Sequence, residues 1–150
     1  MLHYIIDGNN LIGKIGPLHK LQQKNKQASR EKLAFILESF FLGKPNTKTS
    51  LHFDGFPGQS IKIQNIKIIY SGNRIADDEI KSQIEHEKNS RNLIIVSSDL
   101  NLKEFARVCG CQWKSCEDFS KEITRNSPDD EENRKINEMN NDEFKRLFDV

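Results

Sequence analysis

The sequence has no long apolar segment and only three cysteines, and both absences exclude classes of protein. No apolar run reaches the ~20 residues that a membrane-spanning helix needs, and a strand-like segment follows within a few residues of Met1 in place of a signal peptide. The cysteines Cys109, Cys111 and Cys116 are an odd number, which excludes a complete set of internal disulfides. We therefore expect a cytoplasmic protein with reduced thiols and no membrane partner.

The sequence also lacks the motifs of several common ligand sites. The cysteine spacing C-x-C-x4-C has no second ligand pair nearby, whereas a structural zinc ion normally takes four ligands. No G-x-G-x-x-G loop follows the first apolar run, and neither a P-loop lysine motif nor a G-x-S-x-G turn occurs. We therefore expect no structural zinc site, no dinucleotide-binding loop and no α/β-hydrolase nucleophile.

The charged residues nearly balance over the chain but are unevenly placed. The 150 residues include 23 Lys and Arg and 22 Asp and Glu, a net charge of +1. Residues 125–150 contain five basic and eight acidic residues, a net charge of −3, which leaves +4 for residues 1–124. We expect one domain over residues 1–124. Residues 125–150 are expected to form a polar acidic linker and a short C-terminal docking helix, with a disordered tail as the alternative.

Apolar runs of strand length alternate with stretches of helical spacing before residue 124. The runs lie at residues 2–6, 51–53, 66–70 and 93–96, with a short fifth one at residues 112–114. Apolar residues recur at helical intervals over residues 33–41, 80–84, 102–106 and 116–123. This alternation is typical of a parallel sheet covered by helices on both faces. We therefore predict an α/β protein, a three-layer α/β/α sandwich with a central, mainly parallel sheet.

A carboxylate follows each of the first four predicted strands or the turn beyond it. These acids are Asp7, Asp54, Asp77, Asp78 and Asp99. Each alone has an ordinary explanation as a turn residue or a helix cap, but the carboxyl ends of parallel strands share one edge, where ligands bind. Clustered carboxylates need a cation to offset their repulsion, and oxygen ligands without His or Cys favour Mg²⁺ or Mn²⁺. The sequence therefore predicts a metal site at this edge.

A divalent cation held by carboxylates suits the hydrolysis of phosphodiesters, because the metal activates a water and binds the scissile phosphate. Asn10, in the turn after the first strand, is a catalytic candidate that would orient a water or touch phosphate, with a role as a helix cap as the equal alternative. Ser97 would hold a neighbouring carboxylate or simply end a strand. Two other functions stay open. One is a non-catalytic RNA- or ribosome-binding module, and the other is a metal-dependent phosphohydrolase that acts on small phosphate esters.

Residues 14–32 carry six basic side chains and one acid, a net charge of +5. Such a patch attracts a nucleic acid backbone regardless of its sequence, although a solvated helix face gives the same pattern. The candidate RNA-binding residues are Lys14, Lys20, Lys24, Lys26, Arg30 and, ahead of the third acidic position, Arg74.

Five short segments occur in an informative order. They are Ile-Ile-Asp-Gly-Asn-Asn-Leu-Ile at residues 5–12, Phe-Asp-Gly at 53–55, Ile-Ala-Asp-Asp-Glu-Ile at 75–80, Val-Ser-Ser-Asp at 96–99 and Asn-Asp-Glu-Phe-Lys-Arg-Leu-Phe at 141–148. In this order and spacing they resemble the YacP-like branch of NYN domains, which belong to the PIN-like nuclease superfamily. The resemblance spans nearly the whole chain.

The resemblance implies a PIN-like three-layer fold and a metal-dependent endoribonuclease. Such an enzyme would cut single-stranded RNA and leave 5′-phosphate and 3′-hydroxyl ends, and some members act on messenger RNA at the ribosome. The catalytic and metal-binding acids of the family fall at Asp7, Asp77 and Asp99 of this sequence. Supporting roles at the metal fall to Asp54 and Asp78.

Overall fold

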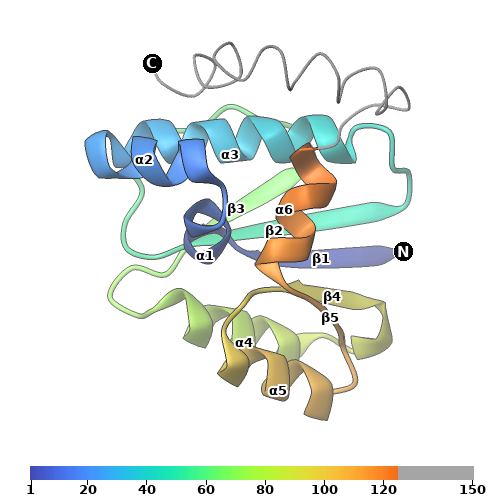
Figure 1. Cartoon of the computed structure of the whole chain (residues 1–150). Coiled ribbons are helices and arrows are strands. Elements are labelled where there is room, and N and C mark those ends of the chain that lie inside the picture. Colours follow the sequence, from blue (N-terminus) through green and yellow to red (C-terminus); the bar gives the residue numbers. More distant parts are fainter. Residues whose placement is uncertain (125–150) are drawn as a thin grey trace.

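The computed structural model describes residues 1–124, which form one sheet with helices on both of its faces (Figure 1). The predicted linker and docking helix fall within residues 125–150 and lie outside the described residues.

Five strands form the sheet, and all of their pairings are parallel. The strands are β1 (Leu2–Asp7), β2 (Thr47–Phe53), β3 (Ile66–Tyr70), β4 (Leu93–Val96) and β5 (Gln112–Lys114). Their order across the sheet is β3-β2-β1-β4-β5, which makes β1 the central strand. The five predicted strands and their parallel arrangement are therefore confirmed.

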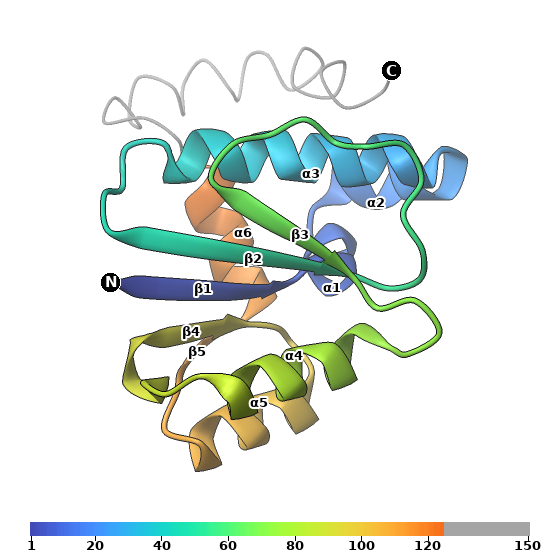
Figure 2. The ribbon, with the colours of Figure 1, turned by 180° about the vertical axis from the view of Figure 1, so that it is seen from behind.

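Six α-helices of residues 1–124 enclose the sheet in two layers (Figures 1 and 2). One layer contains α1 (Gly8–Gly13), α2 (Gly16–Lys24), α3 (Lys26–Phe41) and α6 (Cys116–Thr124). The other contains α4 (Ala76–His86) and α5 (Leu100–Val108), and a turn of 3-10 helix, Ser90–Asn92, precedes β4. The predicted three-layer sandwich is confirmed.

Each face of the sheet packs on its own hydrophobic core. The larger core lies under α1, α2, α3 and α6 and includes Leu33, Leu51 and Phe119, all fully buried. The smaller core lies under α4 and α5, where Ile5 and Ile95 of the sheet meet the inner sides of the two helices. Alternate residues of a strand point to opposite faces, so β1 sends Ile6 into the larger core and Ile5 into the smaller one.

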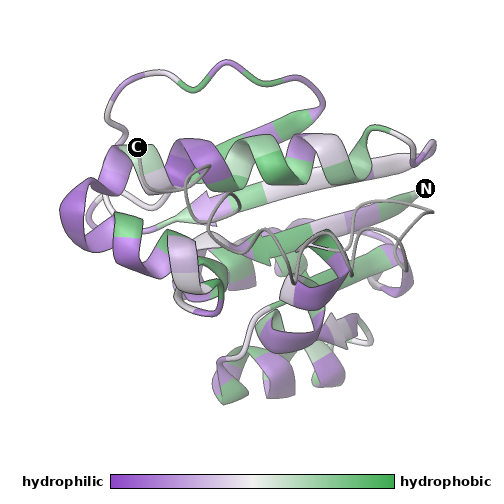
Figure 3. Ribbon diagram, turned by 45° about the horizontal axis from the view of Figure 1, so that its top comes forward, coloured by the Kyte–Doolittle hydropathy of each residue, from purple (hydrophilic) through white to green (hydrophobic). Residues whose placement is uncertain are grey.

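Hydropathy follows this layering. Figure 3 shows apolar residues concentrated on the strands and hydrophilic residues alternating with them along the helices. No helix within residues 1–124 is both long and apolar enough to cross a membrane. All three cysteines are free thiols, with Cys116 buried in the larger core and Cys109 and Cys111 packed against the smaller one.

Candidate active site

Asp7 is the last residue of the central strand, and its side chain is buried. The Ser97 hydroxyl donates a hydrogen bond of 3.1 Å to Asp7 Oδ2, as proposed from the sequence. Burial raises the pKa of Asp7 to about 6, and the charges of Asp54 and Asp99 act in the same direction. Ser97 and the backbone N–H of Asn10 oppose this rise in the pKa without cancelling it. Asp7 is therefore a buried carboxylate that forms no ion pair with any Lys, Arg or His of residues 1–124.

Asp77 lies in the first turn of α4 and is partly exposed. Its partial burial raises its pKa to about 6, and the negative charges of Asp99 and Asp7 also raise it, against a smaller opposing effect of Lys81. The mutual influence of these charges means that acids from β1, α4 and the start of α5 lie within electrostatic reach of one another. The sheet edge thus brings together Asp7, Asp77 and Asp99, which are far apart in sequence.

Asp99 caps the N-terminus of α5. Its Oδ1 accepts hydrogen bonds from the N–H groups of Asn101 (2.8 Å) and Leu102 (3.2 Å), the usual role of an aspartate at this position. The Asp99 N–H donates to Ser97 Oγ at 3.1 Å, and the same hydroxyl donates to Asp7. Ser97 therefore connects Asp7 to the backbone of Asp99 and fixes the distance between the ends of β1 and β4.

Asp54 holds the first residue of α4 in place through its side chain. Its Oδ1 accepts a hydrogen bond of 2.6 Å from the N–H of Ala76, where the N-cap residue Ile75 has no side chain that can do so. The Asp54 N–H in turn donates to Asn9 Oδ1 at 2.7 Å. Asp54 and Asn9 thus position Asp77, a role that sequence reasoning missed because the residues involved are distant in the chain.

Asn10 and Asp78 occupy different environments. Asn10 is the third residue of α1 and is partly buried, so the alternative that it caps this helix is wrong, since the N-cap is Asp7. Asp78 is exposed and is not among the carboxylates whose charge acts on Asp7 or Asp77. The acids whose charges have the largest effect on one another are therefore Asp7, Asp54, Asp77 and Asp99, and the supporting metal role of Asp78 stays a prediction.

The candidate RNA-binding residues divide into three kinds. Lys20, Lys24 and Lys26 are exposed on α2 and at the start of α3. Lys14 and Arg74 are exposed but form ion pairs with Glu117 (3.1 Å) and Glu79 (2.9 Å).

Arg30 is the exception, because it is buried. Its guanidinium lies over the rings of Phe53 and Tyr70, with its Cζ 5.2 and 5.4 Å from the two centroids. It donates hydrogen bonds to the carbonyl oxygens of Asp54 (2.6 Å) and Phe56 (3.1 Å). Its placement on an RNA-binding surface is therefore wrong, and its role is to hold the loop that follows β2.

The acids at the sheet edge fit a hard divalent cation held in part by water. Within residues 1–124, no three His, Cys, Asp or Glu side chains form a complete ligand group. Mg²⁺, however, is commonly held by one or two carboxylates while waters complete its shell. Asp7 meets this requirement best, since a cation would offset both its burial and the repulsion from its acidic neighbours.

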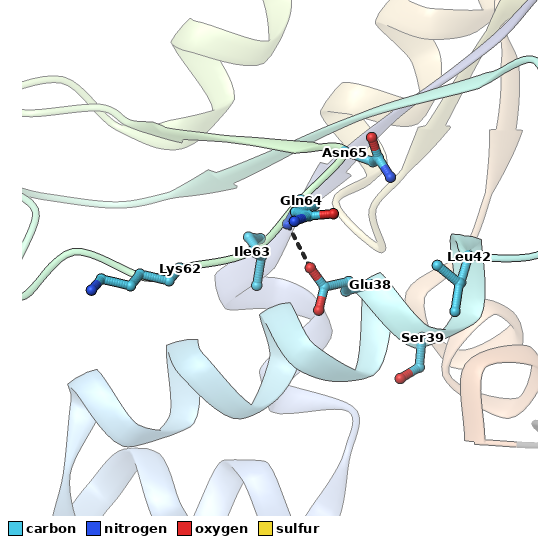
Figure 4. Close-up of a pocket in the computed structure, with 7 residues that line it drawn as sticks. All are labelled: Glu38, Ser39, Leu42, Lys62, Ile63, Gln64 and Asn65. Atoms are coloured by element: carbon cyan, nitrogen blue, oxygen red, sulfur yellow. Dashed lines mark hydrogen bonds between the residues drawn. The ribbon is translucent and has the colours of Figure 1, made fainter.

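A separate hollow of about 580 Å³ lies between α3 and the loop that enters β3 (Figure 4). Glu38 of α3 spans it by accepting a hydrogen bond from the N–H of Gln64. None of the four interacting acids lines this hollow. We therefore place the candidate site at the carboxyl edge of the sheet.

The chain was compared with known families, curated proteins and solved structures. The family model of the YacP-like NYN domain matches residues 4–149. The crystal structure of Rae1 (YacP) from Bacillus subtilis is similar over 98% of this chain and 88% of its own, with 20% identity and a TM-score of 0.71. The crystal structure of a tryptophan-to-leucine variant of Rae1 is similar over 83% of this chain and 76% of its own, with 19% identity and a TM-score of 0.69.

No curated protein matches the chain. The structural similarities show a shared fold, and the family match extends over nearly the whole sequence. This chain therefore belongs to the YacP-like NYN domain family.

Proposed function

We propose that this protein is a metal-dependent endoribonuclease that hydrolyses phosphodiester bonds of single-stranded RNA. The observation that supports this most directly is Asp7, a buried carboxylate with a raised pKa at the carboxyl edge of a parallel sheet, within reach of the charges of Asp54, Asp77 and Asp99. A protein has little reason to bury a carboxylate beside others unless a cation completes the group. Membership of the family supports the same reaction.

Asp7, Asp77 and Asp99 would hold Mg²⁺ or Mn²⁺, and Asp54 would keep Asp77 in place through its hydrogen bond to Ala76. When bound, the cation would lower the pKa of a water and neutralise charge on the scissile phosphate. Hydrolysis forms a bond from the water oxygen to phosphorus and breaks the bond to the 3′ oxygen, which leaves a 5′-phosphate and a 3′-hydroxyl. Asn10, which follows Asp7 on the first turn of α1, would orient the substrate or the water.

Lys20, Lys24 and Lys26 would attract the RNA backbone, because they are exposed and lie on a segment with a net positive charge. Lys14 and Arg74 would join them at the cost of their ion pairs with Glu117 and Glu79. A cytoplasmic location and action on messenger RNA at the ribosome belong to the same proposal.

The test is cleavage of an end-labelled single-stranded RNA by the full chain with Mg²⁺, Mn²⁺ or EDTA. Asp77→Asn removes a proposed ligand that is partly exposed, so this variant is expected to fold, and Asp118→Asn makes the same chemical change at an exposed position on α6. We expect metal-dependent internal cuts with wild type and Asp118→Asn, and at least a 100-fold lower rate with Asp77→Asn, a loss typical of an essential catalytic group.

Undiminished cleavage by Asp77→Asn would overturn the assignment of the site. RNA binding without cleavage under any metal condition would instead indicate the non-catalytic binding module. Turnover of a small phosphate ester without RNA cleavage would indicate the phosphohydrolase.

A further inference from the structure

Exposed large apolar side chains lie beside the acids of the candidate site in the sequence. Eight such residues are exposed within residues 1–124, and three of them lie within two positions of a site carboxylate. Phe56 follows Asp54 and is 63% exposed, Ile75 precedes Asp77 and is 58% exposed, and Leu100 follows Asp99 and is 76% exposed. Folding leaves these side chains in water: Phe56 lies in the loop after β2, Ile75 is the N-cap residue of α4 and Leu100 is the first residue of α5. The edge of the sheet therefore carries both negative charge and an apolar rim.

Phe56 is the aromatic member of this rim, and its backbone is held firmly. The Phe56 carbonyl accepts a hydrogen bond of 3.1 Å from buried Arg30. The N–H of the preceding residue, Gly55, donates to Ser71 Oγ at 3.0 Å, and the Gly55 carbonyl accepts from the N–H of Gly72 at 2.8 Å. Gly55 adopts a φ of 85°, a conformation that glycine takes without strain. The loop is thus fixed by bonds to α3 and to the segment after β3.

The Phe56 ring lies over the segment that leads from β3 to α4. A Cβ atom at Gly72 would be 3.7 Å from Phe56 Cε1, so the ring rests against this glycine on one side. Its high exposure shows that much of the ring surface faces solvent. An aromatic ring held in this way loses little conformational freedom when a flat partner stacks on it.

We propose that Phe56 is a stacking platform for an unpaired nucleobase next to the scissile phosphate, with Ile75 and Leu100 completing the apolar rim. This inference rests on the proposed function and adds to it a reason for single-strand preference. Bases of a duplex are covered by their neighbours, whereas those of a single strand present a face that an aromatic side chain can stack on. The exposed lysines supply attraction to the phosphates, and the rim supplies contact with the base.

The experiment measures binding of the full chain, carrying Asp77→Asn to prevent cleavage, to two labelled oligomers of equal length in Mg²⁺. One is a single-stranded RNA, and the other is its abasic counterpart with the same number of phosphates. Phe56→Ala and Phe56→Trp are compared with Phe35→Ala, which removes a partly exposed phenylalanine from α3.

We expect Phe56→Ala to weaken binding of the RNA by about tenfold, as loss of one base–aromatic stack does, and to leave the abasic oligomer within about twofold. Phe56→Trp should retain the preference for bases, and Phe35→Ala should change neither affinity. The inference is overturned if the protein with Phe56 intact binds both oligomers with equal affinity. It is also overturned if Phe56→Ala leaves the preference for the RNA over the abasic oligomer unchanged.

Failure of this inference is separable from failure of the proposed function. Metal-dependent cleavage with no effect of Phe56→Ala on base preference would overturn the platform alone. A base preference that depends on Phe56, in a protein that never cleaves RNA, would overturn the nuclease alone.

Discussion

The face of the sheet under α1, α2, α3 and α6 is packed by a large apolar cluster, whereas the face under α4 and α5 carries polar groups beside a smaller apolar cluster. Phe41, Phe53 and Phe119 fill the first face. The second contains Asp7 and a buried network that includes His3 and His52. We therefore expect the first face to provide most of the stability of the protein and the second face to provide most of the pH dependence of that stability.

The polar network on the second face is centred on Gln83 of α4. Its Oε1 lies 2.7 Å from His52 Nε2, and its Nε2 donates to Ser50 Oγ at 3.0 Å. Ser50 Oγ also lies 2.8 Å from His3 Nε2, and His3 Nδ1 lies 3.3 Å from Glu87 Oε1. Burial lowers the pKa of both histidines, so their neutral forms are favoured in the folded protein.

The histidines and Asp7 affect stability in opposite senses over the same pH range. The histidine pKa values are lowered from 6.5, so stability from their neutral forms is present above that pH and is lost as pH falls below it. The Asp7 pKa is raised from 3.8 to about 6, so its charge lowers stability at neutral pH and this cost is relieved as pH falls from about 6 towards 4.

The largest expected effect comes from breaking the apolar face. Phe119→Ala should lower the free energy of unfolding by about 3–5 kcal/mol, because it empties a fully buried position in the larger core. Chemical denaturation at pH 7.5 measures the change. Phe35→Ala on the outer side of α3 serves as the control and should cost much less. Equal losses in the two variants would contradict the view that this face carries most of the stability.

The next largest effect is expected from removing the charge of Asp7 on the polar face. This change should raise the free energy of unfolding, whereas Phe119→Ala lowers it. Asp7→Asn should raise the free energy of unfolding of the metal-free protein by about 2–3 kcal/mol at pH 7.5, since folding raises the pKa of Asp7 from 3.8 to about 6. The gain should disappear near pH 4, where the wild-type carboxyl is protonated. Thermal melts in EDTA across this range measure it. Mg²⁺ or Mn²⁺ should stabilise wild type and not Asp7→Asn. If Asp7→Asn without metal is less stable than wild type at pH 7.5, the loss of stability that we assign to the Asp7 charge is wrong.

A smaller loss is expected from the histidine network. Gln83→Met should lower the free energy of unfolding by about 1–3 kcal/mol at pH 7.5, because it removes the hydrogen-bond partner that buried His52 and Ser50 share. Gln112→Met, on the exposed edge of β5, is the control. In an Asp7→Asn/Asp77→Asn background, where the two opposing carboxylate titrations are absent, stability should fall steadily from pH 7 to pH 5. If the free energy of unfolding does not change between pH 7 and pH 5 in this background, the two histidines do not take up protons when the protein unfolds.

The smallest effect is expected from a surface ion pair on the apolar side. Lys114 Nζ lies 2.9 Å from Glu122 Oε1, with both side chains partly exposed. Glu122→Gln should cost about 0.2–1 kcal/mol, and the difference should shrink in 1 M salt. Chemical denaturation at low and high salt measures this loss of stability. A loss as large as that of Phe119→Ala would contradict the expectation that the buried apolar face contributes more stability than the surface ion pair.

Strands and major helices were predictable because their apolar spacing is local. The short helices α1 and α2 were not, since Gly13, Gly16 and Pro17 interrupt any periodic pattern between residues 8 and 24. Pro17 is nevertheless accommodated because it lies in the first turn of α2, where its missing N–H costs nothing.

The candidate site was predictable to the extent that parallel strands place their carboxyl ends together. The prediction for Arg30 failed because a basic residue in a charged run gives no sign that aromatic rings and two carbonyls will enclose it. The anchoring of α4 by Asp54 was equally invisible, since it joins residues 22 positions apart through a loop whose course only the fold determines. Local pattern therefore located the acids but not the contacts that hold them.

The central position of β1 also sets the order in which the molecule becomes complete during translation. β1 is the first of these five strands to be synthesised, yet it pairs with β2 on one side and with β4 on the other. The hydrogen bond between Asp7 and Ser97 joins residues 90 positions apart. A nascent chain that has not yet extended beyond β4 has no such edge, so any activity that depends on this edge begins only after Ser97 has left the exit tunnel.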